Sequence, residues 1–115
     1  MIEFSSFGEV VNWVALVASD AAPKGALGEA GKDACKRLED IVAGDATIAP
    51  RRGNQASATA LDARPLFEQH LAAGLTNFLL QILIEARDDS LVGVKADDLW
   101  AAKTRLIELM ASSAN

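Results

Sequence analysis

The chain has very few residues with the chemistry of a catalytic or metal site. It contains one cysteine, one histidine and no tyrosine, and aromatic residues make up 5% of its 115 residues. A single cysteine forms no disulfide within the chain, and one Cys with one His cannot complete a zinc site. A dyad of Cys35 and His70 is disfavoured, because a free thiol in mid-helix near an apolar face behaves as a small hydrophobic group. We expect no catalytic residues, no metal and no cofactor.

Basic residues are in the minority. There are 11 Lys and Arg against 16 Asp and Glu, which gives a formal net charge of −5. This balance disfavours broad affinity for nucleic acids or anionic membranes. The acidic residues do not predict a site either, because neighbouring pairs such as Asp97 and Asp98 diverge by about 100° on a helix.

No hydrophobic run is long enough to span a bilayer. The longest, residues 78–84, contains Gln81 and is far shorter than the roughly 20 residues that a membrane helix needs. The N-terminus lacks the cationic region of a signal peptide, and Asn12 interrupts the apolar run 10–18. We expect no membrane association and a cytoplasmic location.

Glycine motifs that bind phosphate are also missing. Gly25, Gly28 and Gly31 have the spacing G-x-x-G-x-x-G, whereas the dinucleotide fingerprint is G-x-G-x-x-G after a strand. The P-loop needs a glycine five residues before its Gly-Lys pair and a Ser or Thr directly after it, whereas Gly31-Lys32 has Ala26 and Asp33 at these positions. We interpret these glycines as points of close approach or as a frayed helix start.

What is present is helical periodicity in a globular composition. Half of the chain is hydrophobic and 23% is charged, and apolar residues recur at helical spacing. This predicts one all-α domain over residues 1–115, a four-helix bundle-like fold with helices at roughly 6–19, 21–43, 62–87 and 96–111. Ser6 and Glu9 have the spacing of a capping box at the first helix. The fourth helix is expected to face inward through Leu99, Ala102, Leu106, Leu109 and Met110, widened by Trp100 and Ile107, with residues 112–115 frayed.

The third helix, residues 62–87, is predicted to be the central element. Asp62 is a good N-cap, and Pro65 fits the first turn. The helix is apolar on two sides, and such a helix is usually buried on two sides. We interpret the broader stripe as core-facing: Phe67, Leu71, Leu75, Phe78, Leu79, Ile82 and Ala86. The narrower stripe lies nearly opposite and contains Leu66, Ala73, Leu80 and Ile84.

We interpret the narrower stripe as an association surface. Its four residues recur at spacings of seven, seven and four, a seam that can meet its own copy across a two-fold axis. At 1.5 Å per residue the helix is about 39 Å long, longer than its shorter neighbours can cover. This predicts a homodimer built on the third helix. The alternative is that residues 44–61 or the second helix cover the stripe within one chain.

A polar line of His70, Asn77 and Gln81, with Gly74 beside it, runs between the two stripes. It is the best candidate for a small-molecule pocket. The competing interpretations are a buried hydrogen-bonded stripe and a solvent strip between two apolar contacts.

Residues 44–61 are predicted to form a long flexible loop. The segment contains Pro50, Gly53 and small polar residues without a sustained period. Its paired Arg51 and Arg52 have the chemistry to bind a carboxylate or phosphate of a partner.

These features favour a non-enzymatic interaction module that binds another protein: an inhibitor, an immunity-type or adaptor protein, or an assembly subunit. Its candidate binding residues are Arg51, Arg52 and the narrower stripe of the third helix. The first alternative is a small-molecule binder or small enzyme with a pocket around His70, Asn77 and Gln81. The second is nucleic-acid binding through Arg51, Arg52 and Arg64.

Overall fold

The structure, a computed structural model, describes residues 3–43, 66–86 and 93–113. These residues form four α-helices, one short 3-10 helix and no strand, which confirms the predicted all-α, four-helix arrangement. The elements are α1 (Phe7–Ala21), η1 (Ala22–Lys24), α2 (Gly28–Ala43), α4 (Leu66–Ala86) and α6 (Ala96–Ser113). None of the described helices is both long and apolar enough to cross a membrane.

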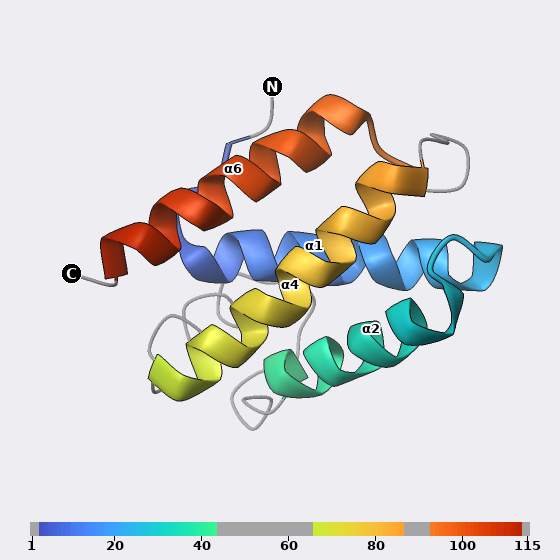
Figure 1. Ribbon diagram of the computed structural model, residues 1–115, viewed down its shortest axis with the longest axis horizontal. Coiled ribbons are helices and arrows are strands. Elements are labelled where there is room, and N and C mark those ends of the chain that lie inside the picture. Colours follow the sequence, from blue (N-terminus) through green and yellow to red (C-terminus); the bar gives the residue numbers. More distant parts are fainter. Residues whose placement is uncertain (1–2, 44–65, 87–92, 114–115) are drawn as a thin grey trace.

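The central position predicted for the third helix, α4, is confirmed. α4 contacts α1, α2 and α6, and in Figure 1 it crosses in front of α1, with α2 and α6 on either side. The buried apolar residues of all four helices form one core, whose largest fully buried side chains include Leu38, Leu79, Leu80 and Leu83. α1 also contacts the other three helices, so α1 and α4 together form the centre of the fold.

The start of α1 follows the predicted capping pattern in part. Ser6 is the N-cap residue, and its hydroxyl oxygen accepts a hydrogen bond from the Glu9 amide at 3.3 Å. The carboxylate of Glu9 reaches back one residue further than a capping box does, and accepts from the Ser5 amide at 2.8 Å. Two amides at the helix start are thereby satisfied, which favours initiation here.

The second helix begins later than its predicted start at residue 21. Ala22–Lys24 forms a single 3-10 turn, and Gly25 (φ 85°) and Gly28 (φ 72°) take left-handed backbone conformations. Residues with a β-carbon adopt these conformations at a cost, so the two glycines let the chain turn between α1 and α2. Asp20 and Pro23 have the spacing of a helix start and favour the predicted start at residue 21, but the glycines after them interrupt the helix.

α6 differs from its prediction at one face and at one end. Leu99, Ala102 and Leu106 are buried as expected, but Trp100 and Ile107 are 52% and 57% exposed, so they do not widen the inner face. The helix continues to Ser113, two residues beyond the predicted end at residue 111.

Several predictions concern residues outside the described ranges. They are the flexible loop 44–61, the candidate contacts Arg51, Arg52 and Arg64, and the helix start at Asp62 and Pro65. The last two residues of the predicted frayed end, 114 and 115, also lie outside them.

Candidate interaction surface

The structure changes the roles assigned to several residues of the two apolar stripes of α4. Leu80 is fully buried, Ala73 is 9% exposed, and Ile84 packs against the core; only Leu66, at the helix start, is exposed. The predicted seam is therefore wrong for Ala73 and Leu80, because neighbouring helices of the same chain cover that side of α4. A second copy cannot reach Leu80 without opening the core.

The stripe predicted to face the core is exposed at its three largest N-terminal members. Phe67 is 77% exposed, Leu71 47% and Phe78 43%. Of the other four members of this stripe, Leu79 is fully buried, and Leu75, Ile82 and Ala86 are partly buried. The interior of the fold therefore lies on the side opposite Phe67, and two phenylalanines remain on the surface.

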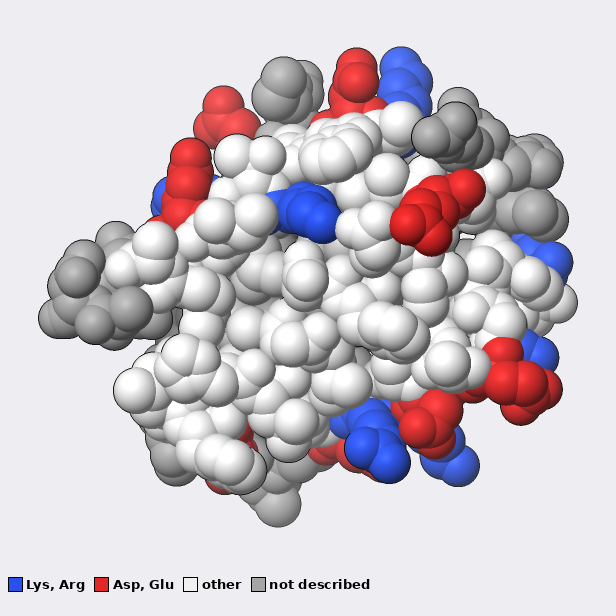
Figure 2. Space-filling model, in the orientation of Figure 1, with Lys and Arg blue, Asp and Glu red and all other residues white. Residues whose placement is uncertain are grey.

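We call the exposed side of α4 the outer face. Its residues recur every three or four positions and are all exposed: Phe67, His70, Leu71, Gly74, Asn77, Phe78, Gln81 and Glu85. In Figure 2, which has the orientation of Figure 1, a broad area over α4 is uncharged, and most charged side chains lie around its margins. The outer face thus combines exposed aromatic and aliphatic groups with neutral polar ones, and Glu85 adds a charged group near the C-terminal end of α4.

The residues of the predicted pocket all belong to this outer face. His70, Asn77 and Gln81 are exposed, so they are not a buried hydrogen-bonded stripe and do not enclose a cavity among themselves. The side-chain oxygen of Gln81 accepts from Nζ of Lys103 on α6 at 2.8 Å, and its side-chain nitrogen donates to Glu85 at 2.7 Å. The three residues form a polar border beside Phe67 and Phe78.

Gly74 leaves a low point in the middle of the outer face. A Cβ added at this position would meet no atom within 4 Å. Leu71 and Phe78 are exposed one turn before and one turn after it. A side chain from another molecule can therefore approach the backbone of α4 here.

The outer face continues onto α6 through Lys103. The Nζ atom of Lys103 donates a hydrogen bond to Gln81, and the same atom lies 5.9 Å from the centre of the Trp100 ring. Trp100 is half exposed and adds an aromatic group at the margin of the face. The position of Trp100 at the margin of the outer face differs from the prediction, which placed Trp100 on the inner side of its helix.

Comparisons with protein-family models, curated proteins and solved structures each find no match.

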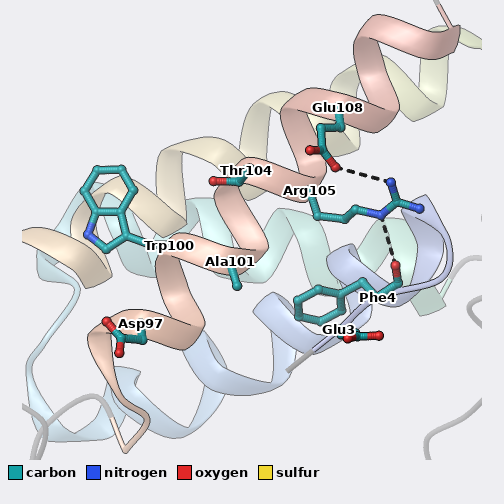
Figure 3. Close-up of a pocket in the computed structure, with 8 residues that line it drawn as sticks. All are labelled: Glu3, Phe4, Asp97, Trp100, Ala101, Thr104, Arg105 and Glu108. Atoms are coloured by element: carbon teal, nitrogen blue, oxygen red, sulfur yellow. Dashed lines mark hydrogen bonds and ion pairs between the residues drawn. The ribbon is translucent and has the colours of Figure 1, made fainter. Parts of the chain in front are cut away.

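A second surface feature is a groove of about 780 Å³ between the N-terminal segment and α6 (Figure 3). Arg105 is the basic residue that lines it. Its Nε donates to the backbone oxygen of Phe4 at 3.0 Å, and its Nη1 lies 3.3 Å from a carboxylate oxygen of Glu108. The Phe4 ring packs edge-on against Trp13, with the ring centres 5.4 Å apart. Arg105 therefore anchors the N-terminal segment to α6.

The single cysteine is poorly placed to act as a nucleophile. Cys35 is 4% exposed. Burial, and to a smaller extent the Glu39 carboxylate, raises the pKa of its thiol above the ordinary value of 9.0. The thiol therefore stays protonated at neutral pH and is a poor nucleophile. Within the three described ranges, no group of three or more His, Cys, Asp or Glu residues is placed to hold a metal ion.

Proposed function

We propose that this chain is a non-enzymatic protein-interaction module that binds its partner through the outer face of α4. The observation that carries the proposal is the joint exposure of Phe67, Leu71 and Phe78 on a helix face that has no Lys, Arg, Asp or Glu from residue 67 to residue 81. Contiguous exposed apolar surface is typical of interaction sites. The proposal covers an inhibitor, an immunity-type or adaptor protein, and an assembly subunit, including a homodimer.

The composition of the outer face supports this proposal. Binding energy in interfaces concentrates in a few large side chains that enter pockets of the partner, and Phe67 and Phe78 are suited to that role. They lie 11 residues apart, about 16 Å along the helix. His70 and Asn77 lie beside them and supply hydrogen-bonding groups that orient a partner. Their exposure supports a contact role for them.

The proposal is tested by comparing two Glu substitutions of exposed apolar residues. Phe78→Glu places a charge in the outer face, whereas Leu16→Glu changes a residue of similar exposure on α1, which is 55% exposed against 43%. Circular dichroism melts first establish that both variants fold. Tagged wild type and variants are then used to capture proteins from the cells that encode the chain.

We expect the wild type and Leu16→Glu to retain the same proteins, and Phe78→Glu to lose them. Equal retention by all three would show that the outer face is not the binding surface. A wild type that retains nothing and is also monomeric at hundreds of micromolar would contradict the proposed function itself.

A further inference from the structure

We infer that the partner on the outer face is a second copy of this chain. The two α4 helices would lie antiparallel, related by a two-fold axis that crosses their outer faces at the level midway between residues 72 and 73. This inference rests on the proposed function and specifies its partner. It moves the predicted homodimer from the buried side of α4, where Leu80 lies, to the exposed side.

The first argument is the position of the exposed residues along α4. In an antiparallel pair of identical helices, a residue of one copy faces a residue of the other copy when the mean of their two residue numbers falls at the level of the two-fold axis. Phe67 with Phe78 and Leu71 with Gly74 share one midpoint, between residues 72 and 73. One two-fold axis therefore brings Phe67 against the partner's Phe78 and Leu71 over the partner's Gly74, and symmetry repeats both contacts.

The second argument is the position of the same residues around the helix. At about 100° per residue, Phe67, Leu71, Gly74 and Phe78 fall within about 60° of one another. They form a single narrow seam, and His70 and Gln81 border it on one side. Leu71 is 47% exposed, and the space above Gly74 is empty to 4 Å. A projecting side chain and a vacant position of this kind fit together as a knob and a hole.

The third argument is electrostatic. Each copy has a formal net charge of −5, so two copies repel each other wherever their acidic surfaces meet. The four residues of the seam are uncharged, and in Figure 2 the acidic groups lie mainly around the margins of the view. Pairing through the seam leaves those charges in solvent, where salt screens them. A strongly basic partner, by contrast, would find few acidic groups in this face.

The seam is small, and this sets the expected strength of the dimer. Stable interfaces bury about 800 Å² per partner, whereas α4 is 21 residues long, a strip about 31 Å by 10 Å. Its continuation through Lys103 to Trp100 adds area. We expect a reversible dimer whose population rises across the micromolar range.

The first experiment measures mass by sedimentation velocity from low to hundreds of micromolar. Gly74→Arg adds a long charged side chain where the chain itself has open space, so the fold is retained and the dimer is lost. Ala30→Arg adds the same charge at an exposed position of α2 and should dimerise as the wild type does. A wild type that is monomeric throughout, or a Gly74→Arg variant that is still dimeric, overturns the inference.

The second experiment tests the antiparallel register by oxidative cross-linking. In the predicted dimer the two copies of residue 74 are offset by about 4.5 Å along the helix axis, and the two copies of residue 85 by about 37 Å. We expect Gly74→Cys to cross-link and Glu85→Cys not to. Cys35 is buried and leaves little background, which the wild type measures. A parallel pair would cross-link at both positions and would overturn the register.

The inference and the proposed function fail in different ways. A monomeric wild type that still captures other proteins, and loses them with Phe78→Glu, overturns the second copy alone. A dimeric wild type that Gly74→Arg renders monomeric supports both.

Discussion

Gly31 of α2 packs directly against Ile82 of α4. A Cβ added at Gly31 would lie 3.0 Å from Cδ1 of Ile82 and 2.8 Å from the Cβ of Leu27, both closer than the 3.5–4.0 Å at which carbon atoms ordinarily pack. The approach of α2 to the central helix thus depends on a missing side chain. Of the two interpretations offered for the glycines 25, 28 and 31, close approach is confirmed at Gly31.

Gly31→Ala is expected to destabilise the fold by about 1 kcal/mol. Overpacking costs about 1–3 kcal/mol, and the better helix propensity of alanine returns about 1 kcal/mol of that. The control is Gly74→Ala, where the added Cβ meets nothing and the propensity gain should appear alone. Urea denaturation measures both, and equal stabilisation by the two substitutions would contradict the tight contact.

Thr76→Val is expected to stabilise the chain by about 1 kcal/mol. Thr76 is fully buried, and its hydroxyl has no hydrogen-bond partner among the described residues. A buried hydroxyl without a partner costs about 1–3 kcal/mol, and valine keeps nearly the same shape. Thr104→Val on the exposed side of α6 is the matched control, with an expected change below about 0.5 kcal/mol. A loss of stability in Thr76→Val would show that the hydroxyl is satisfied after all.

Arg105→Met is expected to loosen the N-terminal segment and to cost about 1 kcal/mol of unfolding free energy, the typical value of one hydrogen bond. The substitution keeps an apolar stem and removes the donor to the Phe4 oxygen. Glu108→Gln removes the exposed ion pair but leaves that donor in place, so it should cost less than about 0.5 kcal/mol. Thermal denaturation of the two variants should separate these effects; equal losses would argue against the anchoring role.

Cys35 should make stability fall at alkaline pH. Folding raises the pKa of the Cys35 thiol above 9.0. Below pH 9 the thiol is protonated in both the folded and the unfolded chain, so its contribution to the free energy of unfolding is fully present. Above pH 9 the unfolded chain releases its proton first, and stability is lost. The difference in unfolding free energy between wild type and Cys35→Ala should therefore be constant from pH 6 to 8 and should decrease above pH 9. A difference that stays constant to pH 10 would mean that the folded thiol titrates normally.

The positions of the helices could be predicted well from the sequence, because a helix that packs on a core requires apolar residues at a spacing that is visible within the segment itself. Six apolar residues of α1 recur at helical spacing and are buried, namely Phe7, Val10, Val11, Val14, Val17 and Ala18. The orientation of α4 was not predictable in the same way, since the helix is apolar on opposite sides and local periodicity does not say which side its neighbours cover.

One signal for the orientation of α4 was present and was given too little weight. Gln81 and Glu85 lie on the same side as Phe67, and a glutamate is rarely buried without a partner. The opposite side contains Ala72, Leu79 and Leu83, and Gln69 and Thr76 are the polar residues near its centre. Its small members allow neighbouring helices to approach. The size of the phenylalanines suggested burial, but the positions of the polar residues marked the surface.

The central position of α4 has a consequence for the covalent chain. Most of the core is divided between residues 7–43, which form α1 and α2, and residues 66–113, which form α4 and α6. Each half exposes the apolar face that the other buries, since α4 contacts both α1 and α2. Two peptides separated between residues 43 and 66 should therefore reassemble without a covalent link, and each should be unfolded alone. In the intact chain, the covalent link keeps each half at a high local concentration near the other half. The specificity of the fold, however, lies in the apolar surfaces through which the two halves pack.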